Sequence, residues 1–406
     1  MTATVFELQR KIGFELEKAH RHLSELPSEG HAYKGVEEVP LSPRRLRRAK
    51  KSYNARHFRN EMRERNYEGY HLRRGSEVEP QVGDFVLARI VEIGQHKRLE
   101  SYNSRRRHLF SDDEIIVAYG DRYAPDQFLS EVPRNLNYTN LVAAGGVAGR
   151  VIEKHEAINP ATVIEPLGLI CDEHGVMNMN RVASHEIKPW REARDEFNAL
   201  EKKPTVVFVF GSSMNSGKST TAGCLVNGLA NAGLHVNAGK ATGTGAGNDA
   251  GLYRDAGADV VVDFTDFGLP STFKIPLDGV KDILFSMTSA LAADGADAVV
   301  IEVADGVYQG ETAALVSDPD FGALVDKVLF ACGEALSAAA GATLLEDAGL
   351  PLVAVSGKLT SAPLITAEAR NVVNVPIIPT YDLCFADVAV GVIGKKIRSS
   401  VEIVDA

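Results

Sequence analysis

The chain has 406 residues, 45% of them hydrophobic and 24% charged, as is typical of a globular protein with two or three domains. No apolar run approaches the length of about 18 residues that a membrane span needs, and the N-terminus lacks the basic-then-apolar order of a signal peptide. The four cysteines show no Cys-x-x-Cys spacing, which disfavours a zinc or disulfide framework. We therefore expect a cytoplasmic protein with reduced thiols and no membrane partner.

Charge is distributed unevenly along the chain. Residues 1–110 carry 23 Lys and Arg against 15 Asp and Glu, a net charge of +8, whereas the remaining residues carry a net charge of −18. This asymmetry predicts domains with different surfaces, and attraction between them favours a homo-oligomer. The basic end also allows a nucleic-acid partner, which we do not favour because the acidic part would repel a long polyanion.

The first 75 residues are expected to form a helical basic arm. Apolar residues at spacings of three and four predict an amphipathic helix over residues 4–26. Residues 27–43 have the composition of a linker, and residues 44–74 are basic with interleaved aromatic residues. Such a stretch either binds single-stranded nucleic acid or packs on another subunit, and glutamates at helical spacing favour the packing role.

Residues 76–185 are expected to form a small β barrel or sandwich. Three segments have strand patterns, and the first is similar to the opening strand of an OB-type barrel. The segments read GDFVLARIVEIG, HLFSDDEIIVAYG and ATVIEPLGLIC. The segments YGDRYAPDQF and LVAAGGVAGRV are interpreted as loops, and residues 186–204 as a linker helix.

From residue 205 to 406, apolar runs alternate with helical patterns. Continuous apolar strands separated by helices predict an α/β fold with a parallel sheet covered on both faces. The expected strands read TVVFVFG, HVNAGK, DAVVIEVA, KVLFAC, PLVAVSG and VPIIPT, and the expected helices span 217–233, 277–293, 334–348 and 363–371.

The first strand-to-helix turn of this region reads GSSMNSGKST. Five residues separate Gly211 from Gly217, one more than in the usual P-loop. A helix N-terminus preceded by small residues offers unpaired N–H groups to a phosphate, Lys218 can reach its β and γ oxygens, and the Ser219 hydroxyl can hold Mg²⁺. The predicted nucleotide-binding residues are Ser213, Met214, Asn215, Ser216, Gly217, Lys218, Ser219 and Thr220.

Acidic residues follow later strands of the predicted sheet. Glu302 ends the strand in DAVVIEVADG and is the preferred Mg²⁺ residue, with Asp305 as the alternative. Asp263 and Asp266 are expected near the same cleft, because open α/β sheets bind ligands beyond the carboxyl ends of their strands.

The glycine-rich segment GKATGTGAGNDAGLYRDAG allows close backbone approach to a ligand. Lys240 offers a positive charge for an anion and Asp249 a ligand for a metal-bound water. The alternative is a flexible loop with exposed charges. A later segment, VSGKLTSAP, is a weaker candidate for contact with a nucleobase.

Three of these motifs, GSSMNSGKST, GKATGTG and VVIEVADG, occur in an order that resembles the dethiobiotin-synthetase-like branch of P-loop proteins. Within that branch the chain is similar to a poorly characterised family with ATG-x-TG after the second strand. The resemblance covers residues 205–380. It departs from the synthetases because no glycine follows Glu302, and from partitioning ATPases because no second lysine precedes Gly217 in the P-loop.

The resemblance implies an ATP- and Mg²⁺-dependent ligase or kinase that uses the γ-phosphate to activate a carboxyl-like group of a small anion. It implies catalytic roles for Lys218, Lys240 and Glu302. Metal binding falls to Ser219 and Glu302, joined by Asp249, and substrate contact to Lys240 with Thr242 and Thr244. Two alternatives stay open: a polynucleotide 5′-kinase whose basic N-terminal region holds the strand, and a nucleotide-dependent regulatory switch.

Overall fold

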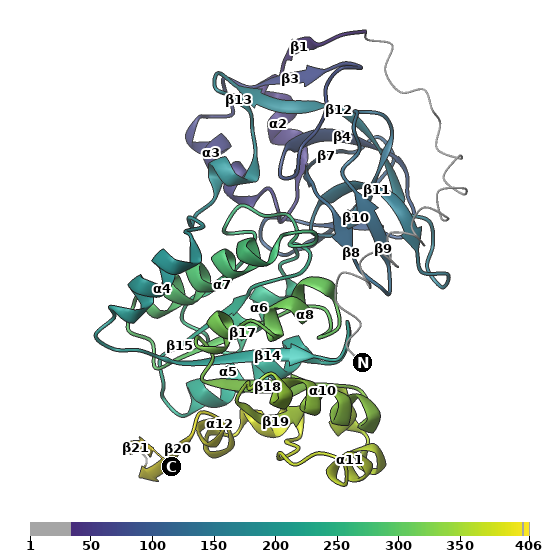
Figure 1. The fold of residues 1–406 in the computed structure, drawn as a ribbon. Coiled ribbons are helices and arrows are strands. Elements are labelled where there is room, and N and C mark those ends of the chain that lie inside the picture. Colours follow the sequence, from purple (N-terminus) through teal and green to yellow (C-terminus); the bar gives the residue numbers. More distant parts are fainter. Residues whose placement is uncertain (1–33, 400–401, 406) are drawn as a thin grey trace. The chain divides into compact units, whose positions relative to one another are not determined.

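A computed structural model describes residues 34–399 and 402–405 of the chain, so the predicted helix over residues 4–26 lies outside the described residues. The chain divides into two compact units (Figure 1). Unit 1 contains the chain up to Glu186 together with residues 244–247 and 264–274, and unit 2 contains residues 187–243, 248–263 and 275–406. No helix in the described ranges is long and apolar enough to cross a membrane.

Unit 1 is mainly β structure. Its strands are β1 (Glu37–Pro40), β2 (Lys50–Lys51), β3 (His71–Arg74), β4 (Phe85–Glu92), β5 (Arg98–Glu100), β6 (Arg106–His108), β7 (Glu114–Tyr119), β8 (Arg122–Tyr123), β9 (Phe128–Glu131), β10 (Thr139–Ala143), β11 (Val147–Lys154), β12 (Thr162–Asp172) and β13 (Gly175–Val176). Its helices are α2 (Pro43–Arg48), α3 (Arg56–Glu64) and the 3₁₀ turn η2 (Met179–Val182).

Five of these strands close into a ring, so of the two predicted architectures, barrel or sandwich, the structure has the barrel. β12 pairs with β4, β4 with β7, β7 with β11, β11 with β10, and β10 returns to β12. Of the five pairs in the ring, the β7–β11 pair is parallel and the others are antiparallel. The segment LVAAGGVAGRV, expected as a loop, instead supplies the end of β10, a tight turn and the first part of β11, because its small residues are buried in the barrel wall.

The basic segment 44–74 is part of unit 1 and does not stand apart as an arm. Phe58 of α3 stacks on Phe85 of β4 with ring centroids 4.6 Å apart, and Tyr70 contacts the Phe58 ring edge-on. β1 pairs with β3, and β3 pairs with β12. The interleaved aromatic residues therefore belong to a hydrophobic core, and no domain boundary lies at residue 75 in the described structure.

Unit 2 is an α/β unit with the parallel sheet that the sequence predicts. Its strands are β14 (Thr205–Gly211), β15 (Val236–Lys240), β16 (Val261–Asp263), β17 (Ala298–Glu302), β18 (Lys327–Ala331), β19 (Leu352–Ser356), β20 (Lys395–Ser399) and β21 (Glu402–Asp405). Its helices are α4 (Trp190–Asn198), α5 (Lys218–Asn231), α6 (Asn248–Asp255), α7 (Leu277–Ala292), α8 (Gly310–Val316), α9 (Pro319–Gly322), α10 (Ala335–Asp347), η3 (Lys358–Ser361), α11 (Pro363–Arg370), η4 (Thr380–Cys384) and α12 (Ala386–Val392).

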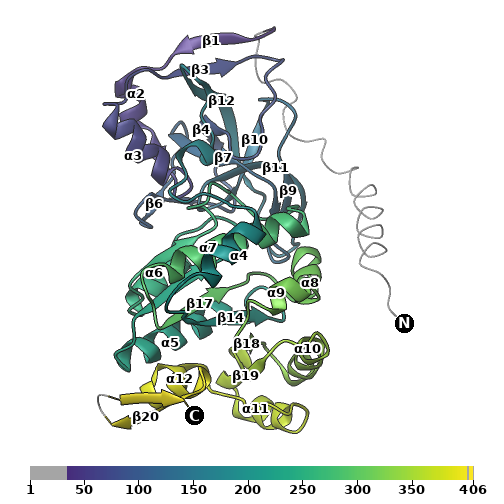
Figure 2. The ribbon, with the colours of Figure 1, turned by 60° about the vertical axis from the view of Figure 1, so that its left-hand side comes forward.

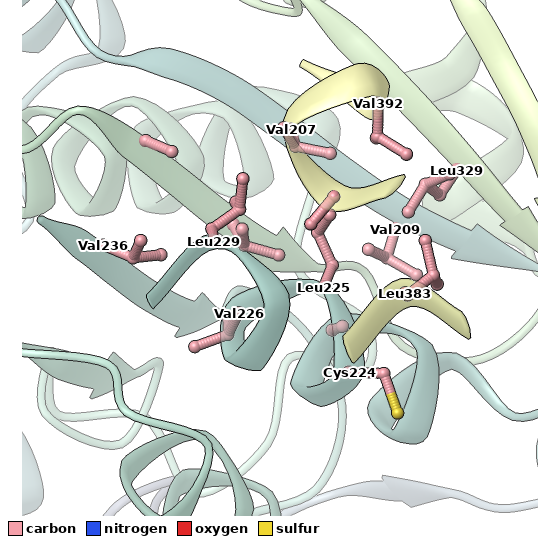
Figure 3. Packing of buried hydrophobic residues seen from close by; sticks show 14 of the residues in the cluster. Val207, Val209, Cys224, Leu225, Val226, Leu229, Val236, Leu329, Leu383 and Val392 are labelled. Carbon is pink, nitrogen blue, oxygen red and sulfur yellow. The ribbon is translucent and has the colours of Figure 1, made fainter. Parts of the chain in front are cut away.

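The sheet of unit 2 has the order β16-β15-β17-β14-β18-β19, and every neighbouring pair is parallel. Alternate residues of β14 face opposite sides. Val207 and Val209 pack against α5 and α12 (Figure 3), whereas Phe208 and Phe210 pack on Phe321 on the other face. Burial on both faces explains why the strand is apolar throughout.

Three local predictions in unit 2 differ from the structure. The linker helix corresponds to α4, which packs on α7 as part of unit 2 (Figure 2), with Trp190 against Phe285. The glycine-rich segment contains a helix, α6, because NDAGLYRD buries Tyr253 on one face. VPIIPT forms only an isolated bridge from Ile377 to Val355, since two prolines flank the apolar residues.

Candidate nucleotide site

The two ends of the turn between β14 and α5 lie close together. A Cβ atom at Gly211 would lie 2.4 Å from Oγ of Ser216 and 2.7 Å from Cγ of Lys218, so only glycine fits there. Asn215 and Gly217 adopt left-handed backbone conformations, with φ of 64° and 101°. No side chain caps the N-terminus of α5 at Gly217, which leaves its first N–H groups for an anion.

Lys218 spans the inside of this loop. Its side chain is buried, and its ammonium donates hydrogen bonds to the carbonyl oxygens of Ser213 at 2.9 Å and Asp305 at 2.6 Å. Burial lowers the pKa of Lys218, while Glu302 and Asp305 act in the opposite direction. The ammonium therefore lies beside the loop carbonyls, with acidic residues in its surroundings.

Polar atoms in the same loop are buried without partners. The Ser216 hydroxyl has no hydrogen-bond partner within the described part of the chain, and the same holds for Thr221 in the first turn of α5. An unsatisfied buried hydroxyl costs about 1–3 kcal/mol. A phosphate oxygen at the loop would satisfy Ser216, so the residues present fit a nucleotide phosphate.

A charged cluster lies at the carboxyl ends of the neighbouring strands. The register pairs Asp263 with Lys240 and Lys240 with Glu302, which sets these side chains on the same face of the sheet. The Lys240 ammonium forms an ion pair with Asp249 of α6 and lies 3.7 Å from Oε1 of Glu302. Burial acts to lower the pKa of Lys240, but the charges of Glu302 and Asp249 outweigh it and raise the pKa above its ordinary value.

The carboxylates of this cluster have further partners. The Tyr253 hydroxyl donates a hydrogen bond to Glu302, and the Ser219 hydroxyl is near enough to Asp249 to lower the pKa of that carboxyl. Burial acts to raise the pKa of Asp249, yet Lys240 and Ser219 hold it below its ordinary value. Tyr253 was missed by the sequence reasoning, although its position four residues after Asp249 would place both on one helical face.

Magnesium fits this donor set. No group of three His, Cys, Asp or Glu side chains in the described ranges is arranged to hold a metal ion by itself. Mg²⁺ at a nucleotide site does not require one, because it usually combines one or two protein oxygens with phosphate oxygens and waters. Ser219 and Asp249, whose pKa Ser219 lowers, offer such oxygens. Glu302, whose Oε1 lies 3.7 Å from the Lys240 ammonium, offers a second carboxylate.

The two expected substrate threonines both contact neighbouring backbone or strand residues. The Thr242 hydroxyl accepts a hydrogen bond of 2.8 Å from the backbone N–H of Ala304, so it fixes the turn after β17. Thr244 belongs to unit 1, where it bridges to Ser271. Asp266 is also in unit 1 and is held by Arg56 at 2.5 Å and His57 at 2.8 Å. These contacts fix the positions of Thr242, Thr244 and Asp266, and the substrate contact expected of the two threonines stays a prediction.

A pocket of about 430 Å³ adjoins the loop in unit 2. It is lined by Asn215, Gly217, Thr220, Gly357, Lys358, Thr360, Ser361, Pro379, Thr380, Tyr381 and Asp382. The Thr380 hydroxyl accepts a 3.1 Å hydrogen bond from Gly357 N–H and lies 3.1 Å from the Thr360 hydroxyl, so the two walls are tied together. The segment VSGKLTSAP contributes one wall, as the sequence suggested, whereas the Thr380–Asp382 wall was not anticipated.

Comparisons with known proteins leave the family open. No protein-family model matches the chain, and no curated protein matches it. Among solved structures, it is similar to the signal recognition particle receptor FtsY from Elizabethkingia anophelis, with 18% identity and a TM-score of 0.31 over 50% of this chain and 67% of that chain. It is also similar to the septum site-determining protein MinD complexed with Mg-ADP from Pyrococcus horikoshii, with 14% identity and a TM-score of 0.30 over 46% and 88% of the two chains.

A third similar structure is signal recognition particle 54 kDa protein from Aeropyrum pernix in complex with GDP, with 19% identity and a TM-score of 0.30 over 48% of this chain and 49% of that chain. This chain therefore spans about two thirds of the FtsY structure and half of the 54 kDa protein. The P-loop NTPase fold of unit 2 follows from its parallel sheet and the loop between β14 and α5.

Proposed function

We propose that unit 2 binds ATP with Mg²⁺ and uses the γ-phosphate to modify a small anionic molecule, as a kinase or ligase. The observation that carries the proposal is the turn at residues 211–219. It combines an uncapped helix N-terminus, a buried lysine and an unsatisfied serine hydroxyl at one place. These are the donors that a polyphosphate requires.

The charged cluster supports a metal next to the phosphates. Lys240, Asp249 and Glu302 together carry a net charge of −1, which attracts a cation more than a free anion. Mg²⁺ bound by Ser219 and these carboxylates would neutralise the negative charge of the phosphates. With the carboxylates compensated, Lys240 is available to hold an anionic substrate, the function that the resemblance implies.

The pocket beside the loop fits the nucleoside. Its walls combine the Tyr381 ring, which is 75% exposed, with hydroxyls of Thr360 and Thr380 and the charges of Lys358 and Asp382. A flat apolar surface with a few polar groups is what a purine and ribose require. In this arrangement the phosphates lie at residues 213–219 and the base lies toward Tyr381.

The experiment is calorimetric titration with ATP, with and without Mg²⁺, followed by measurement of ADP formation in the presence of pooled small carboxylic acids and alcohols. We expect micromolar binding and ADP formation that requires one pool. The absence of ATP and GTP binding at millimolar nucleotide would contradict the proposal.

A polynucleotide 5′-kinase is a second candidate, favoured by one feature of unit 1. The hairpin β5–β6 exposes Lys97, Arg98, Arg105 and Arg106, none of which forms an ion pair within the described residues. Guanidinium groups bind phosphates well. Salt-sensitive binding of single-stranded RNA below micromolar at physiological salt, lost when these four residues are changed to Ser, would favour this candidate over the small-molecule enzyme.

A further inference from the structure

Unit 1 has a pocket of its own, with a volume of about 510 Å³. It lies between α2, β4 and the turn before β7, elements that are neighbours in unit 1 (Figure 1). Its volume falls in the range of about 300–1,000 Å³ that small-molecule sites have. Four arginines and three acidic residues line it, so the pocket fits an ionic ligand and not an apolar one.

The walls of the pocket are fixed by contacts within unit 1. Leu46 anchors α2 because its side chain is fully buried in the core. On the same helix, the Arg45 guanidinium binds the Glu114 carboxylate of β7 through Nε at 3.0 Å and Nη2 at 2.7 Å. The turn before β7 is tied to β4, since the Asp112 N–H donates to the Ile90 carbonyl at 2.9 Å. A ligand therefore meets charges whose supporting backbone is already in place.

Most charges of the pocket are paired with each other or with adjacent residues. The ion pair between α2 and β7 compensates two of them, and the Lys50 ammonium forms an ion pair with Asp113. The Arg89 guanidinium lies 3.4 Å from Oε2 of Glu165 on β12. These groups have a counter-charge before any ligand binds.

Three charged side chains of the pocket have no such counter-charge. Arg44 and Arg48 of α2 form no hydrogen bond, ion pair or ring contact with any residue that the structure describes, and the same holds for the Asp112 carboxylate. Arg44 and Arg48 are four positions apart, so they are neighbours on one face of the helix, where like charges repel. The pocket thus offers two adjacent guanidiniums on one wall and one carboxylate on another.

We propose that this pocket binds a small phosphate monoester that also carries an amino group. The phosphate of a monoester has nearly two negative charges at neutral pH, which matches the two guanidiniums of Arg44 and Arg48. Guanidinium groups bind phosphate oxygens through pairs of N–H donors. The ammonium of the same ligand donates to the Asp112 carboxylate. Each unpaired charge of the pocket then has a partner of opposite sign.

A polynucleotide fits this pocket less well than a small molecule. Each phosphodiester carries a single negative charge and no ammonium, so the Asp112 carboxylate would stay uncompensated. Neighbouring phosphates of the strand would also approach the acidic wall at residues 112–114, where like charges repel. The site consists of unit 1 residues only, so the inference is independent of the function proposed for unit 2.

The test is calorimetric titration of the full chain with three probes in a phosphate-free buffer. O-phosphoethanolamine carries both groups, ethyl phosphate lacks the amine, and ethanolamine lacks the phosphate. We expect O-phosphoethanolamine to bind at least about threefold more tightly than ethyl phosphate, because an ion pair at a partly exposed carboxylate adds little more than this. Ethanolamine alone should not bind at millimolar concentration.

Four variants locate the site. Arg44→Gln and Arg48→Gln should each weaken both phosphate probes about tenfold or more. Asp112→Asn keeps a residue that tolerates the φ of 65° and should abolish the preference for O-phosphoethanolamine over ethyl phosphate. Arg63→Gln, an exposed change on α3 outside the pocket, should alter neither affinity. All four should keep the wild-type melting temperature, since the replaced side chains have no partner in the described structure.

Several results would overturn the inference. These are no binding of O-phosphoethanolamine at millimolar concentration, equal affinities for the two phosphate probes, and unchanged affinities in Arg44→Gln and Arg48→Gln. An equal loss in Arg63→Gln would show attraction by the overall charge and not by a site. If O-phosphoethanolamine does not bind but single-stranded RNA does, and the two arginine variants abolish this, the arginines belong to a nucleic-acid interface.

Discussion

The Lys240 ammonium lies 3.7 Å from Oε1 of Glu302, at positions that the parallel register pairs across β15 and β17. The same ammonium is ion-paired with Asp249 on α6. One lysine thus compensates two carboxylates from different elements. The single positive charge of Lys240 holds the two carboxylates together, and the three groups keep a net charge of −1.

Lys240→Met should destabilise the protein in a pH-dependent manner. The variant leaves two partly buried carboxylates without their counter-charge, at an expected cost of about 3–5 kcal/mol at pH 8. Because Lys240 lowers the pKa of Asp249, that residue stabilises the fold above its unfolded pKa, and this contribution is lost as the pH falls through the folded value. Urea unfolding should therefore show a smaller difference between the two proteins at pH 4 than at pH 8, and equal differences would contradict the pairing.

Lys218→Ala should weaken ATP binding and abolish turnover without unfolding unit 2. Charge-assisted hydrogen bonds to phosphate contribute about 1.5–3 kcal/mol, or roughly 10- to 150-fold in Kd. Calorimetry with ATP and with tripolyphosphate measures this loss, which should appear with both ligands. Lys202→Ala is a matched control, since Lys202 is exposed and pairs only at the surface with Asp297 and Gly295. The same affinity in Lys218→Ala and wild type would refute the phosphate site.

Tyr381→Ala should distinguish the nucleoside pocket from the phosphate loop. Loss of stacking on the ring is expected to weaken ATP binding by about 1–3 kcal/mol while leaving tripolyphosphate affinity unchanged. Leu364, which is 81% exposed and lies outside the pocket, provides the control variant Leu364→Ala. Parallel losses for ATP and tripolyphosphate would exclude the proposed position of the base.

Glu302→Gln should reduce Mg²⁺-dependent turnover more than metal-free nucleotide binding. The amide keeps the size of the side chain but removes the charge that attracts the cation. Tyr253→Phe tests the partner of Glu302, because it removes the hydroxyl that donates to the carboxylate. We expect a milder effect from Tyr253→Phe than from Glu302→Gln when the Mg²⁺ concentration for half-maximal turnover is compared. An unchanged Mg²⁺ requirement in Glu302→Gln would transfer the metal to Asp249.

Phe58→Ala should destabilise unit 1 by about 3–5 kcal/mol, because it removes a buried ring that stacks on Phe85. Arg63→Ala, an exposed change on the same helix, should have little effect. Thermal unfolding measures both. If segment 44–74 were an independent arm, the two variants would have equal melting temperatures.

The sequence alone determined the features that depend on local pattern. The run TVVFVFG followed by small residues and GKST predicted β14, the turn and α5, because strand hydrophobicity, glycine freedom and helix propensity are properties of neighbouring residues. Alternation in GDFVLARIVEIG predicted β4 in the same way. The α/β fold of unit 2 and the barrel of unit 1 followed from the repetition of such patterns.

Only the tertiary structure decided which distant residues meet. Register brings Lys240 beside Glu302, and α6 adds Asp249 and Tyr253, contacts that no spacing in the sequence specifies. The Thr242 hydroxyl accepts a hydrogen bond from the backbone of Ala304 in the turn after β17, a contact between positions 62 residues apart. The interleaved basic and aromatic residues of segment 44–74 are compatible both with a nucleic-acid-binding arm and with a packed core. Phe58 is buried against Phe85, a strand residue 27 positions further along the chain. This packing, which the sequence does not specify, shows that the segment is part of a core.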